Sequence, residues 1–122
     1  MSDFDTDTTL NIGESAPLFG SVEAEDGGYD TILSATYQMW LLPSGEPVAP
    51  PIGLTDYTTP ISLPSSNYDS QPAEVVRAWY LPNTTNLPEA DYEFEFLINC
   101  LGDDGVTRNK SARGIVRVVS IP

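Results

Sequence analysis

Proline is spread through most of the chain, and this distribution limits the secondary structure more than any other feature of the sequence. The 122 residues include 11 prolines, the first at Pro17 and the last at Pro122. An internal proline costs a helix about 3 kcal/mol, because it removes a backbone donor and clashes with the preceding turn. Between the prolines lie short runs rich in Val, Ile, Tyr, Phe, Trp and Thr, bounded by Gly, Asn and Asp. This pattern is typical of an all-β domain.

The clearest strand is DYEFEFLINC, residues 91–100. Apolar side chains alternate along it at Tyr92, Phe94, Phe96, Ile98 and Cys100. Polar side chains occupy most of the positions between them, so one face is predicted to pack on a core and the other to meet water. The stretch GDDG that follows predicts a tight turn, because Asp-Gly tolerates a positive φ. GIVRVVSI, residues 114–121, is then the returning strand, and its apolar character on both faces predicts a central or covered position.

Further strands are predicted at residues 8–12, 16–24, 34–42 and 73–81, with a short edge piece at 46–50. Residues 50–72 are predicted to form a long ordered loop with at most one edge strand. About seven short strands in a chain of this length favour a two-sheet antiparallel sandwich with Greek-key connections. We expect a single domain over residues 8–122, preceded by an acidic flexible arm over residues 1–7.

The chain is strongly acidic, with a formal net charge of −13. This charge repels nucleic acid and anionic membranes, so neither is expected as a partner. No apolar run approaches the roughly 20 residues of a membrane span. The first residues lack a basic region followed by an apolar one, so we expect no secretion.

The charges are unevenly distributed. Residues 1–30 carry acids and no base, whereas four of the five bases fall in the last fifteen residues. One interpretation is solubility together with local ion pairing. The other is an acidic arm on one subunit that meets a basic loop, Arg108 to Arg113, on a neighbour. The candidate interface residues are Asp3, Asp5, Asp7, Arg108, Lys110 and Arg113.

Residues suited to catalysis are scarce. The chain has no histidine, which is the commonest general base and metal ligand. Its one cysteine, Cys100, ends an apolar strand face and reads as a small buried hydrophobe. Carboxylates are plentiful, but no pair stands out as an acid and base. We therefore predict a protein that is not an enzyme, with no catalytic residue and no cofactor.

The opening stretch DFDTDTTLNIGE matches part of a calcium-loop template. Asp3, Asp5 and Asp7 occupy its first alternate positions, and Glu14 closes the window. The sixth position, however, holds Thr8 where the template requires glycine, and no helix is predicted on either side. An acidic arm leading into the first strand is the preferred interpretation, and no metal site is assigned.

Aromatic residues raise a second functional hypothesis, a carbohydrate-binding β-sandwich module. The candidates for a sugar-stacking platform are Tyr37, Trp40, Tyr57, Tyr68, Trp79 and Tyr80. Tyr37 and Trp40 face opposite ways on a strand, as do Trp79 and Tyr80, so at least one of each pair is expected in the core.

A series of motifs resembles a family of phage virion domains similar to the N-terminal domain of the baseplate upper protein. The matching motifs are Gly13-Glu14, Asp26-Gly27, VVRAWYLPNTTNLPEADYEFEF over residues 75–96, Asp104-Gly105, and GIVRVV over residues 114–119. The stretch Pro88–Tyr92 is similar to a tyrosine corner, whose hydroxyl hydrogen-bonds to upstream backbone. Two features depart from the pattern: the 50–72 loop is longer, and Ala90-Asp91 replaces the usual glycine before the tyrosine.

The resemblance implies an immunoglobulin-like sandwich that binds other virion proteins and catalyses nothing. It implies a tail or baseplate adaptor, or a capsid decoration protein, present in several copies that also contact one another. Such a protein would be assembled in the host cytoplasm and reside in the virion. Because the chain ends at Pro122, directly after the last predicted strand, we expect the domain to stand alone.

Overall fold

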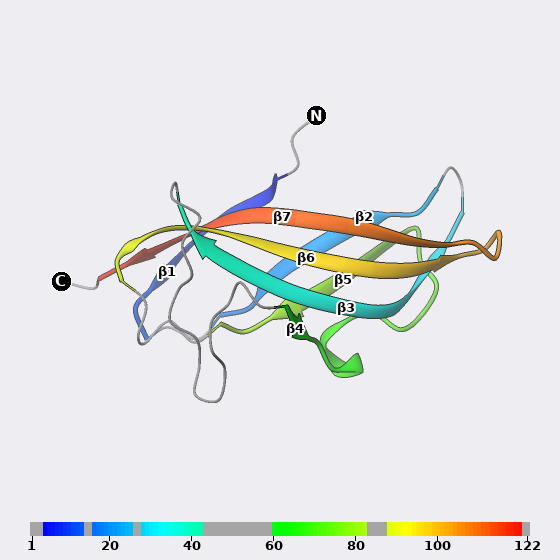
Figure 1. The fold of residues 1–122 in the computed structure, drawn as a ribbon, viewed down its shortest axis with the longest axis horizontal. Helices are drawn as coiled ribbons and strands as arrows, with labels where there is room; N and C mark the ends of the chain where they lie inside the picture. The colour runs from blue at the N-terminus through cyan, green and yellow to red at the C-terminus, as the bar shows by residue number, and fades with distance from the viewer. Residues whose placement is uncertain (1–3, 14–15, 26–27, 43–59, 83–87, 121–122) are drawn as a thin grey trace.

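The computed structural model describes residues 4–13, 16–25, 28–42, 60–82 and 88–120, and this part of the chain is built from strands (Figure 1). The all-β prediction is confirmed. The elements are β1 (Phe4–Asn11), β2 (Leu18–Glu23), β3 (Asp30–Leu41), β4 (Ile61–Ser62), a short 3-10 helix η1 (Ser65–Asn67), β5 (Val75–Tyr80), β6 (Ala90–Gly102) and β7 (Thr107–Val119). Within these ranges no helix has the length and apolar character needed to cross a membrane.

The strands form two sheets of unequal width. The larger sheet has the order β1-β7-β6-β3-β4, and the smaller sheet pairs β2 with β5. The small sheet packs on one face of the large one, with β2 against β7 and β5 against β3. Figure 1 shows β2 and β5 running behind the long strands β6 and β7. The core therefore lies between a two-stranded layer and the middle of a five-stranded layer.

The prediction that all strands are antiparallel is wrong for the first one. β1 runs parallel to β7, with Thr8 opposite Val116 and Leu10 opposite Val118, whereas the other pairs are antiparallel. The larger sheet is therefore mixed. Alternation of side chains cannot distinguish the two directions, because parallel and antiparallel ladders both have a period of two.

Three strands begin several residues earlier than expected, and one of them is β3, which starts at Asp30 instead of Ser34. β1 begins at Phe4 instead of Thr8, so residues 4–7, which we expected in a flexible arm, lie in a strand beside β7. β7 begins at Thr107 instead of Gly114. The prediction of a basic loop from Arg108 to Arg113 is therefore wrong, because this segment is part of β7 and pairs with β6. The expected edge piece at 46–50 lies outside the described residues.

Alternating apolar residues of β6 form the centre of the core, as the sequence predicts. Tyr92, Phe94, Phe96 and Ile98 have no exposed surface and Cys100 is 1% exposed. The Tyr37 ring of β3 stacks on the Tyr80 ring of β5, with ring centroids 4.4 Å apart. This stack joins the two sheets, because one ring comes from each of them.

Tyr92 also makes the contact that the tyrosine-corner interpretation predicts. Its hydroxyl donates a 2.5 Å hydrogen bond to the carbonyl oxygen of Pro88. Burial raises the pKa of the Tyr92 phenol, so the hydroxyl keeps its proton at neutral pH. The bond ties the backbone just before β6 to a side chain of that strand.

A bulge in β3 places an acid at the edge of the core. The pairing of β3 with β6 shifts register between Ile32 and Ser34, and Leu33 and Ser34 are both exposed. One extra residue reverses the side-chain phase of the strand. As a result Asp30, only 1% exposed, shares the inward face with Ile32.

Candidate functional site: the basic strand and its acidic partners

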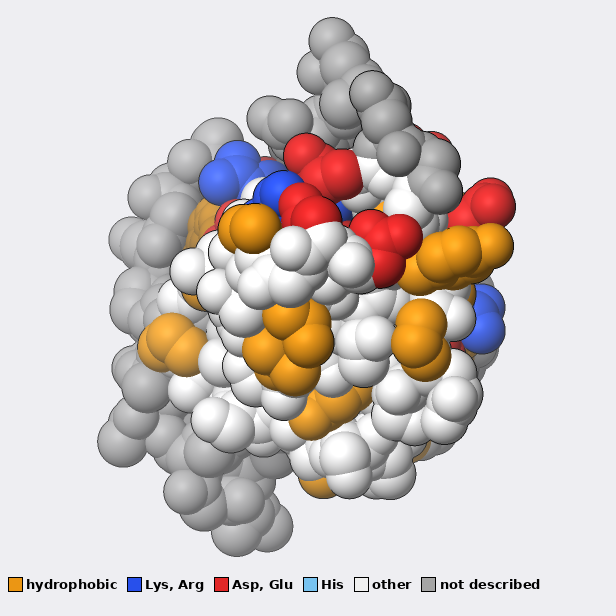
Figure 2. Space-filling view, turned by 90° about the vertical axis from the view of Figure 1, so that its right-hand side faces the viewer, with side chains coloured by type: hydrophobic (Ala, Val, Ile, Leu, Met, Phe, Trp, Pro, Cys, Tyr) orange, Lys and Arg blue, Asp and Glu red, His pale blue; other side chains and the backbone are white. Residues whose placement is uncertain are grey.

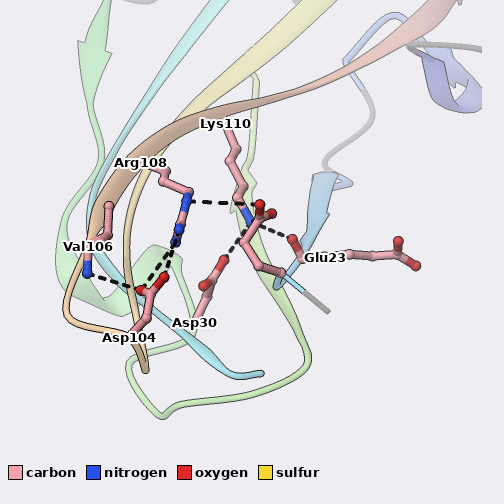
Figure 3. A network of polar contacts seen from close by, with 7 residues as sticks. Glu23, Asp30, Asp104, Val106, Arg108 and Lys110 are labelled. Atoms are coloured by element: carbon pink, nitrogen blue, oxygen red, sulfur yellow. Dashed lines mark hydrogen bonds and ion pairs between the residues drawn. The ribbon is translucent and has the colours of Figure 1, made fainter. Parts of the chain in front are cut away.

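The candidate interface residues Arg108 and Lys110 lie on the inward phase of β7, in line with Ala112, Val116 and Val118. They occupy the end of the sandwich where the β6–β7 hairpin turns (Figure 1). At that end polar side chains replace the apolar ones, and a network of acids surrounds the two bases (Figure 3).

Lys110 lies at the centre of this network. Its Nζ contacts Asp30 Oδ2 at 2.8 Å and Glu25 Oε2 at 3.3 Å, and it donates a 2.6 Å hydrogen bond to the Glu23 carbonyl oxygen. Only 16% of the Lys110 side chain and 2% of the Asp30 side chain are exposed. Burial lowers the pKa of Lys110, but hydrogen bonds to Asp30 and Glu25 outweigh it, so that the pKa is raised overall. The ammonium therefore stays charged in the folded protein.

Lys110 and Asp30 also join the two sheets. Lys110 comes from the large sheet and Glu23 from the small one, so their hydrogen bond crosses the gap between the layers. The backbone of Asp30 exchanges hydrogen bonds with Ala73, which precedes β5. At the hairpin end, Lys110 thus connects the large sheet to β2, and Asp30 connects it to the residue before β5.

Arg108 is held by the turn itself. Its Nη2 lies 2.7 Å from Asp104 Oδ2, and its Nε lies 3.9 Å from Glu25 Oε1. The backbone N–H of Val106 donates a second bond to Asp104. The hydrogen bond from Arg108 is the main cause that lowers the pKa of Asp104, followed by the bond from Val106. Asp104 therefore carries its charge at neutral pH and pairs with Arg108.

Arg113 and Arg117 lie on the outer face of the large sheet. Arg113 Nε contacts Glu95 Oε2 at 3.0 Å, and Arg117 Nε contacts Asp91 Oδ1 at 2.8 Å. Both pairs join residues directly opposite each other on β7 and β6. The hydrogen bond from Arg117 lowers the pKa of the Asp91 carboxyl. Each base of β7 thus has an acid within the same chain, as local ion pairing requires.

The acidic candidates lie beside this strand. Asp5 and Asp7 belong to β1, which pairs with β7, and Phe4 is opposite Arg113. Asp3 lies outside the described residues. The acidic segment and the basic strand, which we had considered as contacts between subunits, are therefore neighbours in a single chain.

The acidic window does not have the form of a calcium loop over its described part. Residues 4–11 are extended in β1, whereas the template requires a tight loop. Glu14 lies outside the described residues. Among the residues that the structure describes, no group of three or more acids or cysteines is placed to hold a metal ion.

Cys100 lies next to the charged network but is itself unreactive. Burial raises the pKa of its thiol to about 11, and the charge of Asp30 contributes further. The thiol is therefore protonated at neutral pH, and the nucleophilic form is the thiolate.

The aromatic residues do not meet in one platform. Tyr37 and Tyr80 stack in the core, as expected for one member of each pair. Trp40 and Trp79 lie on the outer phases of different sheets. Tyr57 lies outside the described residues. Tyr68 is partly buried and packs against the core. Trp79 lies beside Phe19, with ring centroids 6.5 Å apart and the planes tilted by 50°.

Hydrophobic side chains at the hairpin end are scattered. Figure 2 looks at this end of the molecule and shows acidic and basic side chains together on one side, with hydrophobic side chains in separate spots. Isolated exposed apolar residues are ordinary on protein surfaces, whereas contiguous patches mark interaction sites. The apolar side chains of the described part of this face therefore do not form one contiguous patch.

Several members of the network were missed by sequence reasoning, namely Glu23, Glu25, Asp30 and Asp104. Asp104 could have been found from the sequence, because it belongs to the predicted Asp-Gly turn. Asp30 had none, because the bulge changes the phase of β3.

No protein-family model matches the chain, and neither does any curated protein or solved structure.

Proposed function

We propose that the chain is an immunoglobulin-like domain that serves as a non-enzymatic structural protein of a phage virion. Its strand order supports the fold assignment. Immunoglobulin domains place strands G, F and C in one sheet and B and E in the other. The order β7-β6-β3 opposite β2-β5 corresponds to this arrangement, with chain crossings between the sheets as in a Greek key.

The single observation that carries the proposal is the hydrogen bond from the Tyr92 hydroxyl to Pro88. The tyrosine corner is a feature of immunoglobulin-like sandwiches at the entry to strand F, and β6 occupies that position. The motif that resembles the phage family, LPEADY, contains both residues. The bond therefore supports the immunoglobulin-like fold that the resemblance implies.

The mode of action in this proposal is contact between protein surfaces. The net charge of −13 favours basic partner surfaces and steers their approach. The acids of the N-terminal segment, Asp3, Asp5 and Asp7, remain our candidate contacts. Arg108 and Lys110 are less suited, because a partner acid would have to displace Asp104 and Asp30.

The test is the location of the chain in purified phage particles. We expect mass spectrometry to detect it at a fixed copy number in each particle, and cryo-electron microscopy to place it on the head or tail. A particle preparation that lacks the chain, or enzymatic turnover by the pure protein, would overturn the proposal.

A charge variant then tests the contact residues. Deleting residues 4–9 would remove most of β1, so the better variant is Asp3→Asn/Asp5→Asn/Asp7→Asn, which keeps the strand and removes charge. We expect a lower copy number per particle with unchanged folding. The matched control is Asp69→Asn, which removes a carboxylate beside β5, away from β1. An unchanged copy number in the triple variant would exclude these acids as contacts.

Carbohydrate binding remains a second candidate because Phe19 is 41% exposed beside Trp79. However, the Arg77 guanidinium already lies over the Phe19 ring, 5.4 Å from its centroid. A glycan array probed with the wild type and with Trp79→Ala tests this candidate. Binding that the variant loses while it stays folded would favour a carbohydrate-binding module.

A further inference from the structure

β2 is an edge strand of the small sheet, and its hydrogen-bonding groups alternate in direction. The N–H of Ala24 donates to the Glu74 carbonyl, so this residue pair is hydrogen-bonded. In an antiparallel ladder the residues between such pairs direct their N–H and C=O groups to the other side. Phe19, Ser21 and Glu23 therefore present their backbone groups away from β5.

The opposite edge of the small sheet is covered. The Arg77 carbonyl accepts from the Asp69 N–H, the Trp79 carbonyl accepts from the Asn67 side chain, and Ala73 exchanges bonds with Asp30. On the β2 edge, Lys110 reaches the Glu23 carbonyl. Within the described part of the chain, no further hydrogen bond engages the outward backbone groups of Phe19 and Ser21. In the described part of the chain, the β5 edge is thus hydrogen-bonded at several residues, whereas the β2 edge is engaged at Glu23.

Among the residues that the structure describes, the two layers differ in width and no strand lies beside β2 on this edge. Five described strands lie in the large sheet and two in the small one. β2 packs against β7 and also contacts β1, the next strand outward. A strand added beside β2 would extend the small layer over β1.

The chemistry around the edge defines the partner. The outward face carries Phe19, 41% exposed, near one end of β2 and Glu23 at the other. Glu25, with 62% of its side chain exposed, follows directly. A second copy of the chain would bring another −13 charges and its own glutamates to this edge, which disfavours self-pairing.

We propose that β2 accepts an extended segment of another protein by β-strand addition, through the backbone of Phe19 and Ser21. The segment carries a basic side chain beside Glu23 and an apolar one beside Phe19. Backbone hydrogen bonds provide affinity in this mode of recognition, and alternate side chains provide specificity. The proposal stands apart from a location in a virion, because any protein with such a segment could bind.

The test uses the full chain and a short synthetic peptide that presents, on one face, a lysine to lie beside Glu23 and a valine to lie beside Phe19, since these two residues share a face of β2. We expect binding in calorimetry, and slower amide hydrogen exchange at Phe19 and Ser21, whose N–H groups point outward. Gly20 and Val22 already bond to β5, so their exchange should change little. The same peptide with glutamate in place of that lysine is the charge control and should not bind.

A proline substitution tests the edge directly. Ser21→Pro removes an outward N–H without breaking the ladder to β5, as prolines do on edge strands. We expect the affinity to fall about tenfold or more, since one backbone bond is lost and the ring hinders the partner. Ser21→Ala keeps the N–H and should bind as the wild type does.

Absence of peptide binding would overturn the proposal, and so would equal binding of both peptides or protection confined to other strands. A dimer in sedimentation that Ser21→Pro dissolves would assign the edge to a second copy and overturn the proposed partner. If Ser21→Pro fails to fold, the exchange pattern at Phe19 and Ser21 in the wild type decides alone.

Discussion

At the scale of single residues, Asp30 is the most constrained polar side chain that the structure describes. It is buried beside Ile32, and its carboxylate pairs with Lys110, which is itself mostly buried. Removing one partner of a buried pair leaves an uncompensated charge, which typically costs about 3 kcal/mol or more. We therefore predict that Asp30→Asn lowers the free energy of unfolding by about 3 kcal/mol in denaturant titrations.

The matched control for this prediction is Asp91→Asn. Asp91 also pairs with a base across two strands, but 42% of its side chain and 65% of that of Arg117 are exposed. Exposed pairs contribute little, because water solvates both partners. A similar loss of stability in the two variants would contradict the special role assigned to Asp30.

Cys100 gives a prediction about pH. Its pKa is raised from 9.0 to about 11 in the folded protein. Well below pH 9 the thiol is protonated in both states and stability is independent of it. Between pH 9 and 11 the unfolded chain loses the proton first, so stability falls by about 2 to 3 kcal/mol as the pH rises.

Urea titrations at a series of alkaline pH values measure this loss. Cys100→Ala removes the thiol and should show a shallower decline over the same range. The decline should persist in part, because burial also raises the pKa of Tyr92. An identical pH dependence in wild type and variant would exclude the thiol as a cause.

At the scale of elements, Gly20 sets how closely β2 approaches the large sheet. A Cβ at this position would lie 2.6 Å from Phe96 Cδ2 and 2.9 Å from the Ala112 Cβ. Both distances are shorter than van der Waals contact, so Gly20→Ala must push β2 away or move the Phe96 ring. We predict a loss of about 1 to 3 kcal/mol, the usual cost of overpacking a core.

Thermal and denaturant unfolding of Gly20→Ala measure this cost. Ser21→Ala is the control on the same strand, since its side chain points outward and should change stability by less than about 0.5 kcal/mol. A neutral Gly20→Ala would show that the two layers are less closely packed than the distances indicate.

The elements differ in how far their sequences predict them. β6 was predictable because Tyr92, Phe94, Phe96 and Ile98 alternate with polar residues and no irregularity intervenes. The first half of β7 was not, because Arg108 and Lys110 occupy inward positions where the pattern requires apolar residues. These inward positions are possible only because acids from β3, from the segment after β2 and from the β6–β7 turn meet the two bases. Most of these contacts are tertiary.

At the scale of the whole molecule, the number of strands followed from turns and alternation, but their arrangement did not. The sequence of β1 contains no feature that favours parallel pairing with β7, and the bulge near Ser34 leaves no local signal. The bases of β7 form ion pairs within the chain, which is one of the two interpretations of the charge distribution, but the sequence does not show which acids they meet.

The net charge also gives a prediction at this scale. With 18 acids and 5 bases, repulsion among the excess carboxylates opposes folding. Salt screens exposed charges over a Debye length of about 10 Å at 0.1 M. We therefore predict that the melting temperature rises when sodium chloride is added to a low-salt buffer, measured by circular dichroism.

The variant Asp5→Asn/Asp7→Asn, which removes two excess charges, should show a smaller rise with salt. A melting temperature that falls as salt is added would mean that the ion pairs of β7 outweigh the general repulsion.

The parallel pairing of β1 with β7 has a mechanical consequence. Phe4 lies opposite Arg113 at one end of this pair, and Asn11 lies opposite Val119 at the other. A force that pulls the two ends of the chain apart therefore acts along the strands and shears them. In this geometry the hydrogen bonds share the load and must rupture together, whereas an antiparallel hairpin pulled at its open end unzips one bond at a time. The terminal strands thus act as a clamp against extension.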